Sequence, residues 1–229
     1  MARCTVCGGE SFVHNPVLWD ALIAEWQLSP HEVAYVNRQQ GTACTSCGAN
    51  LRIIALANAI RAAVNTSGTL REFVSMPRAQ YLDVLEVNEA GNLGTILRRI
   101  TGHVLARYPE VDIHALPYRN NTFDLVIHSD TLEHVANPVQ ALAECRRVLK
   151  PGGALCFTVP TIVGRLSRTR AGLPKSYHGF PGTARDDYVV ASEFGADAWA
   201  FVIQAGFASV SIATVDYPDA IAYMAKIDG

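Results

Sequence analysis

Two pairs of cysteines in the sequence have the residue types and spacing of metal ligands. Each pair follows the pattern Cys-x-x-Cys-Gly, in CTVCGG near the amino terminus and in CTSCGA at residues 44–49. Such a turn presents two thiolates from one tight knuckle, and zinc binds four soft ligands in a tetrahedron that leaves no open position for a substrate. The sequence therefore predicts one structural zinc site, with two incidental turns as the alternative interpretation. The predicted ligands are Cys4, Cys7, Cys44 and Cys47.

A second candidate site is the turn that follows a predicted buried strand, in DVLEVNEAGNLG at residues 83–94. The dinucleotide fingerprint GxGxxG is broken here and no Walker lysine is present, so neither a pyrophosphate site nor a P-loop is predicted. Glu86 precedes the turn, and Asn88 and Gly91 tolerate the left-handed backbone that makes a turn tight. A carboxylate at this place would repel phosphates but suits a cationic ligand that carries an amino group.

Composition limits the class of protein. The chain has 229 residues, 49% of them hydrophobic and 17% charged, with a formal net charge of −2, so no global positive field attracts nucleic acid or an anionic membrane. No apolar stretch approaches the ~18 residues of a membrane span, and the amino terminus lacks the apolar region of a signal peptide. We therefore expect a cytoplasmic protein whose cysteines are thiols or metal ligands.

The elements that must position these residues follow an α/β pattern. A capping box, Ser29-Pro30-His31-Glu32, begins a helix between the cysteine pairs, so residues 1–50 are expected to form a zinc-binding ribbon with a helical insert. Apolar residues at near-helical spacing predict linking helices over 51–78. Residues 79–229 then form the proposed catalytic domain, with a lid loop over 160–187.

Strand and helix patterns alternate after Tyr81, which predicts a parallel sheet with helices on both faces. The chain ends in a helix and two strands around Tyr217-Pro218-Asp219, which indicate an antiparallel hairpin. Only 35 residues run from Asn88 to Thr122, and one βαβ unit alone takes ~30, so the second crossover helix must be reduced. The predicted fold class is a Rossmann-like, doubly wound α/β sheet with an antiparallel last strand.

From Tyr81 to about Ala225 the sequence resembles the class I S-adenosylmethionine-dependent methyltransferases of the small-molecule type, the type 11-like group. The resemblance is carried by VLEVNEAGNLG and, more specifically, by the pair FDLVIHSDTLEHV and RRVLKPGG. It implies that Glu86 sits near the amino-acid end of the cofactor and that the turn of Asn88 and Gly91 lies against it.

The same resemblance implies further cofactor contacts. Asp112 matches an acid that bonds the adenine amino group, and Ile113 matches the residue that packs on the ring. Ser129 and Asp130 match positions that face the cofactor and the substrate, and Asp130 is one of two predicted catalytic residues. At the place of the family's ribose-binding acid the sequence has Arg107 and Tyr108, so the ribose partner stays open. His134 is a predicted cofactor-side contact and a second candidate base.

The loop after the fifth predicted strand is basic, and TIVGRLSRTRAGLPKSYHGFPGTAR contains no acid. Guanidinium groups bind phosphate or carboxylate in bidentate fashion, so the loop predicts an anionic acceptor, with a solvated charge run as the alternative. His178 in this loop is the first candidate for a general base and the other predicted catalytic residue. The predicted acceptor-binding residues are Arg165, Arg168, Arg170, Lys175 and Tyr177.

The favoured function is methyl transfer from S-adenosylmethionine to a small molecule, a hydroxyl of a sugar or secondary metabolite, nucleotide-linked or otherwise anionic. One alternative is an rRNA base methyltransferase with a zinc ribbon, but only Arg3 and Arg38 are cationic in residues 1–50, too few for phosphate binding. Another is a non-catalytic zinc-ribbon interaction protein with a degenerate cofactor fold. The sequence carries no signal for an oligomeric state.

Overall fold

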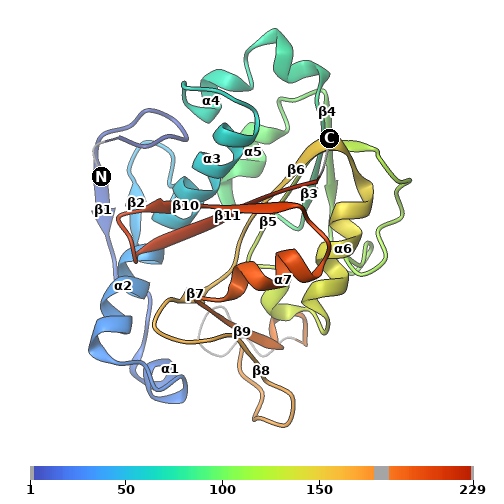
Figure 1. Ribbon diagram of the computed structural model, residues 1–229. Coiled ribbons are helices and arrows are strands. Elements are labelled where there is room, and N and C mark those ends of the chain that lie inside the picture. The colour runs from blue at the N-terminus through green and yellow to red at the C-terminus, as the bar shows by residue number, and fades with distance from the viewer. Residues whose placement is uncertain (1–2, 178–185, 228–229) are drawn as a thin grey trace.

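The protein is described from a computed structural model, which places residues 3–177 and 186–227 (Figure 1). A six-stranded sheet crosses its centre in the order β10-β11-β6-β5-β3-β4. Strands β4, β3, β5 and β6 are parallel, while β11 is antiparallel to both β6 and β10. This arrangement confirms the predicted fold class. The strand bounds are β3 Asp83–Val87, β4 Gly102–Ala106, β5 Phe123–Ser129, β6 Leu149–Thr158, β10 Ser209–Val215 and β11 Ala220–Lys226.

Helices cover both faces of this sheet. Helix α3 (Leu51–Ala63) packs on one face, where its largest buried side chains include Ile54, Leu56 and Ile60. Helices α6 (Pro138–Val148) and α7 (Ala198–Gln204) pack on the other face. Asn50 and Asn137 cap α3 and α6 by accepting hydrogen bonds from Ile53 N and Gln140 N. The apolar faces of these helices therefore build two core layers, one on each side of the sheet.

The two crossovers next to β3 are short. After β3 the chain makes one 3-10 turn, η2 (Gly91–Leu93), and one turn of helix, α5 (Gly94–Leu97). Residues 107–122, which connect β4 to β5, form neither helix nor strand. The predicted reduction of the second crossover helix is thus confirmed, and the connection is left to line the edge of the sheet.

The amino-terminal region surrounds α3. Strands β1 (Phe12–His14) and β2 (Thr42–Cys44) pair antiparallel, and the insert between them forms α1 (Asp20–Glu25) and α2 (Pro30–Gly41). The predicted capping box begins α2. Cys4, Val6 and Cys44 belong to the same apolar cluster as α3, so packing is continuous across residue 50. The domain boundaries stay predictions. Short helices α4 (Leu70–Phe73) and η1 (Pro77–Tyr81) complete this side.

A second, small sheet lies beneath the ends of the main strands. It has the order β7-β9-β8, formed by Thr161–Ile162, Ser192–Gly195 and Arg168–Thr169. Apolar contacts join it to the insert, through a cluster of Tyr35, Val36 and Ile162. Within the described residues, no helix is both long and apolar enough to cross a bilayer.

His128 occupies an unusual place in the core of β5. Its ring is fully buried and stacks on Phe157 with 5.0 Å between ring centroids, and Phe157 stacks in turn on Tyr223. Neither ring nitrogen has a hydrogen-bond partner among the described residues. Burial lowers the pKa of His128 from its ordinary 6.5 to about 4, and the charge of Glu133 opposes only part of this shift. The imidazole is therefore neutral in the folded protein.

We predict that this histidine makes the protein acid-sensitive. Because its pKa is lowered on folding, its contribution to stability is complete above pH 6.5 and is lost as pH falls toward 4, since the unfolded chain takes up the proton first. Unfolding by denaturant at pH 7 and pH 5 should show a loss of about 2 kcal/mol from this group. His128→Leu should remove that loss, whereas the surface substitution His31→Leu should retain it. Equal pH dependence in both variants would contradict the prediction.

Candidate functional site

The four amino-terminal cysteines form one cluster. Their sulfur atoms all lie within 4.8 Å of one another, and the Sγ–Sγ distances Cys4–Cys47 and Cys7–Cys44 are both 3.7 Å. A tetrahedral zinc site with bonds of about 2.3 Å has edges of about 3.8 Å. The two knuckles also repeat each other, because Gly8 N donates to Cys4 O and Gly48 N donates to Cys44 O, each over 2.7 Å. The donor set and its geometry fit a zinc ion.

Burial makes this cluster unfavourable as free thiolates. It raises the pKa of the Cys4 thiol to about 11 and raises that of Cys47 as well. Thiolates grouped this closely need a compensating cation, and a divalent metal ion supplies it.

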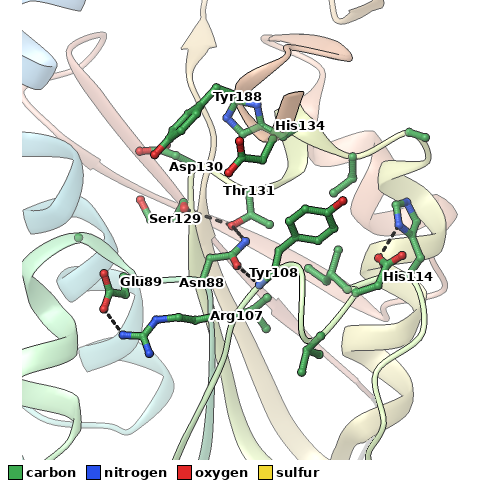
Figure 2. Close-up of a pocket in the computed structure, with 18 of the residues that line it drawn as sticks. Asn88, Glu89, Arg107, Tyr108, His114, Ser129, Asp130, Thr131, His134 and Tyr188 are labelled. Carbon is green, nitrogen blue, oxygen red and sulfur yellow. Dashed lines mark hydrogen bonds and ion pairs between the residues drawn. The ribbon is translucent and has the colours of Figure 1, made fainter. Parts of the chain in front are cut away.

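A cavity of about 680 Å³ opens at the carboxyl ends of β3, β4 and β5 (Figure 2). Its volume lies within the ~300–1,000 Å³ of small-molecule sites, and its position is where open α/β sheets bind ligands. Its walls come from the start of α3, the turn after β3, the segment after β4, the end of β5 and the 3-10 turn η4 (Asp186–Tyr188). The lining residues lie within 50–53, 87–91, 107–114, 129–136 and 187–188.

The turn after β3 has the left-handed residues that its sequence predicts. Asn88 has φ 53° and Gly91 has φ 54°. Asn88 N donates to Ala106 O over 2.7 Å, and its side-chain oxygen accepts from Tyr108 N over 3.0 Å. Asn88 thereby joins the first two strands of the sheet at the cavity edge, and both Asn88 and Gly91 line the cavity.

Glu86 has a different place from the one predicted. Its carboxylate is fully buried, accepts from Ala90 N over 2.9 Å and lies 2.7 Å from Nε2 of His103. It does not line the cavity. It holds the turn from within the core. The acid of this turn that lines the cavity is Glu89, which the sequence reasoning missed. Glu89 lies in a turn, where no helix or strand periodicity predicts which way a side chain points.

The segment after β4 supplies the far wall of the cavity. Arg107 makes an ion pair with Glu89, and the ring of Tyr108 is 58% exposed at the rim. Asp112 Oδ1 accepts from both the backbone nitrogen and Nδ1 of His114, each over 2.8 Å. The backbone hydrogen bond from His114 lowers the pKa of Asp112, which keeps it an ionised acceptor. Ile113 lies beside it, buried, and lines the same wall.

The end of β5 carries a strained acid. Asp130 has φ 50°, which is uncommon for a residue other than glycine and is typical of functional positions. Its Oδ2 lies 2.8 Å from Nη2 of Arg52. The Arg52 side chain is 8% exposed, and its Nε and Nη1 have no hydrogen-bond partner among the described residues. Ser129 Oγ pairs with Thr158 Oγ1 over 2.8 Å, which fixes the strand end. Sequence reasoning missed Arg52 because its helix was interpreted as one of the linking helices over 51–78.

His134 lies in the 3-10 turn η3 (Leu132–His134) and lines the cavity next to Tyr188 (Figure 2). Its Nδ1 lies 3.0 Å from the carbonyl oxygen of Val189. Since a carbonyl only accepts, Nδ1 carries the proton and Nε2 is the basic nitrogen of the neutral ring. Nε2 lies 3.7 Å from Oε1 of the buried Glu133.

The predicted acceptor-binding arginines lie in ion pairs. Arg165 binds Glu32 with Nε–Oε1 2.7 Å and Nη2–Oε2 2.9 Å, and it holds the pKa of that carboxyl at about 2. Arg168 and Arg170 both pair with Glu193. The acids absent from the loop come from distant parts of the chain. These arginines therefore tie the loop to α2 and β9.

None of the five predicted acceptor-binding residues is among those that line the cavity. Lys175 is exposed, and Tyr177 forms an isolated bridge with Val189. His178, the first candidate base, lies outside the described residues.

The cavity can now be compared with known proteins. A methyltransferase domain model matches residues 68–157. The match covers about two fifths of the chain, from α4 to β6, and includes the cavity walls after β3, β4 and β5. The cysteine cluster, Arg52 and Tyr188 lie outside it.

Curated relatives match parts of the chain. The chain is 39% identical over 94 residues to an uncharacterised protein of transposon TN4556 from Streptomyces fradiae, covering 41% of this chain and 26% of that protein. It is 34% identical over 97 residues to a probable S-adenosylmethionine-dependent methyltransferase of Mycolicibacterium smegmatis, covering 34% and 38%. A ubiquinone biosynthesis O-methyltransferase of Roseobacter denitrificans is 40% identical over 53 residues, covering 23% and 21%. The chain thus spans well under half of the length of these relatives.

Solved structures with similar folds include the CurJ carbon methyltransferase, at 13% identity and a TM-score of 0.46 over 91% of this chain and 70% of that one. Another is a possible histamine N-methyltransferase from Thermotoga maritima, at 14% identity and a TM-score of 0.43 over 76% and 89%. Because these identities and TM-scores are low, the fold is assigned from the strand order of the structure itself.

We predict that Gly91 cannot be replaced without strain, because a Cβ there would lie 2.7 Å from Cδ1 of the buried Ile53. Gly91→Ala should reduce the free energy of unfolding by at least about 1 kcal/mol more than Gly172→Ala, as expected for overpacking. Gly172 is the matched control, since it also has positive φ, at 80°, but meets nothing within 4 Å. Adding Ile53→Val should recover part of the loss. Equal losses in a urea titration would contradict this packing.

Proposed function

We propose that the protein transfers a methyl group from S-adenosylmethionine to a small-molecule acceptor. The observation that carries the proposal is the cavity at the carboxyl ends of the parallel strands, whose acidic and apolar walls coincide with the part of the chain that matches the methyltransferase domain. A sulfonium cofactor with an adenine, a ribose and an amino-acid end needs a different partner at each of these places, and the cavity has candidate partners for the adenine and the amino-acid end.

The cofactor would lie along the wall formed by the segments after β3 and β4. Asp112 has an ionised oxygen for the adenine amino group, and Ile113 offers an apolar surface to the ring. Asn88, Glu89 and Arg52 also line the cavity. The buried guanidinium of Arg52, whose Nε and Nη1 have no hydrogen-bond partner among the described residues, suits the carboxylate of the amino-acid end.

We propose a hydroxyl-bearing acceptor, such as a sugar or another secondary metabolite, on the side of Asp130, His134 and Tyr188. In methyl transfer the acceptor oxygen forms a bond to the methyl carbon while the carbon–sulfur bond breaks and its electron pair stays on sulfur. His134 Nε2 would take the hydroxyl proton, supported by Glu133. Arg165, Arg168 and Arg170 are paired with carboxylates, so they do not support a nucleotide-linked or otherwise anionic acceptor. Such acceptors form one arm of an acceptor screen.

We further propose that the cysteine cluster holds one structural zinc ion. The 3.7 Å sulfur–sulfur distances support this assignment, as does the burial of Cys4 and Cys44 beside the half-buried Cys7 and Cys47. With four protein ligands the ion has no position left for a substrate, so it would act on the fold and not on the methyl group.

Calorimetry with S-adenosylhomocysteine, the product that remains after methyl transfer, tests the cofactor site. We predict saturable binding, weakened about tenfold or more by Arg52→Leu, as expected for loss of charge-assisted hydrogen bonds to a carboxylate. Methylthioadenosine, which lacks the amino-acid end, is the control ligand, and its affinity should be unchanged by the substitution. Equal weakening of both ligands would show that Arg52 acts only on structure. Absence of binding in the zinc-loaded protein would overturn the proposed function and favour a non-catalytic interaction protein.

Metal analysis of the purified protein tests the zinc assignment. We predict about one zinc per chain, lost in Cys47→Ser because three thiolates bind the ion far more weakly than four. Cys145→Ser is the control, since Cys145 is the more buried of the two cysteines but lies in α6 away from the cluster. Zinc retained in Cys47→Ser, or lost in both variants, would contradict the assignment.

A further inference from the structure

We infer, on the basis of the proposed function, that the metal site positions the cofactor cavity, so that zinc and the cofactor raise each other's affinity. The second knuckle (residues 44–48) touches two of the walls that form the cavity, and the first knuckle (residues 4–8) is anchored elsewhere on the main domain. A metal ion that joins the two knuckles therefore fixes the position of both walls.

The first link runs from the second knuckle to the turn after β3. The side-chain nitrogen Nδ2 of Asn92 donates to the carbonyl oxygen of Cys47 over 2.5 Å. Asn92 lies in η2, directly after Gly91, and the turn that ends in η2 carries the cavity residues Asn88 and Glu89. A shift of the knuckle is thus transmitted to the cavity by one hydrogen bond.

The second link runs through the chain itself. Cys44 N donates to Ala49 O over 2.9 Å, and Ala43 forms a bridge with Asn50. Asn50 in turn caps α3 by accepting from Ile53 N over 2.9 Å. Asn50, Arg52 and Ile53 all line the cavity. The second knuckle therefore sets the start of the helix that carries the buried guanidinium.

The third link anchors the first knuckle. Leu70 N donates to Thr5 O over 2.9 Å and Arg71 N donates to Val6 O over 3.0 Å, so this knuckle is held by the start of α4. The sulfur cluster joins this knuckle to the second one at the distances of a metal shell, alongside the pairing of β1 with β2 and the hydrogen bond from Thr45 N to Ser11 O. Without the ion, four thiols, two buried and two half-buried, meet at that junction, and the short β1–β2 pairing holds the second knuckle less firmly.

Two ligands that favour the same arrangement of a protein are linked reciprocally. If zinc raises the affinity for S-adenosylhomocysteine by some factor, S-adenosylhomocysteine raises the affinity for zinc by the same factor, and such factors typically lie at about 5–150. Asn92 is a positioning residue in this scheme, because it contacts the knuckle and not the cavity ligands.

The test measures that factor from both directions. Calorimetry gives the affinity for S-adenosylhomocysteine in zinc-loaded and zinc-stripped protein, and competition with a chelator gives the zinc affinity with and without saturating S-adenosylhomocysteine. We expect both to change at least about fivefold in the wild-type chain. In Asn92→Ala the factor should fall toward one, while Thr95→Ala should keep it. Thr95 is the matched control because its hydroxyl donates to Asn92 O in the same turn without touching the knuckle.

The outcomes separate this inference from the proposed function. If the zinc-loaded protein does not bind S-adenosylhomocysteine, the proposed function is overturned. Binding that is equal in loaded and stripped protein, with stripped protein shown to be folded by circular dichroism, overturns the coupling alone. If stripping unfolds the chain, chelator competition decides the question: a factor that is the same in wild type, Asn92→Ala and Thr95→Ala reports linkage through global folding and overturns the positioning role.

Discussion

The buried carboxylate of Glu86 is the constraint on which the cavity depends. A carboxylate with no exposed surface must be hydrogen-bonded, and this one is held by the amide of Ala90 and by His103 on the neighbouring strand. The amide contact bends the chain back over the end of β3 and so fixes the turn that carries Asn88 and Gly91. It also explains Gly94, where a Cβ would lie 2.9 Å from Glu86 Oε1. The buried carboxylate of Glu86 therefore sets the positions of Asn88, Gly91 and Gly94 in this turn.

Much of the fold follows from local patterns. The capping box predicted at Ser29 begins helix α2, and the alternating pattern after Tyr81 forms the parallel strands β3, β4, β5 and β6. Such features depend on side-chain alternation and on hydrogen bonds between residues three positions apart, which a sequence displays directly. The same holds for the two cysteine knuckles, because each is one short turn. That the two knuckles meet was predicted from the preference of zinc for four thiolates, and the structure brings their sulfur atoms within 4.8 Å of one another.

The side-chain partners across the fold did not follow from the sequence. The loop from residue 161 to 185 is free of acids, yet Arg165 finds Glu32 and both Arg168 and Arg170 find Glu193, from parts of the chain distant in sequence or on another strand. Local charge balance is therefore a poor guide to which cations are available for a ligand. Arg52 is the converse case: it sits in an apolar helix with no sequence signal, yet it lines the cavity and its guanidinium is buried.

The charged side chains thus have two separate roles. Arg165 binds the small sheet to the amino-terminal insert, and Arg168 and Arg170 bind Glu193 within that sheet. Arg52, Asp112 and the residues after β5 lie around the cavity. Hydrogen–deuterium exchange with saturating S-adenosylhomocysteine tests this division most directly, because it reports on every stretch of backbone at once. The account predicts slowed exchange at residues 50–54, 88–94, 107–114 and 129–136. Unchanged exchange there, or slowing confined to the arginine loop at 161–176, would contradict it.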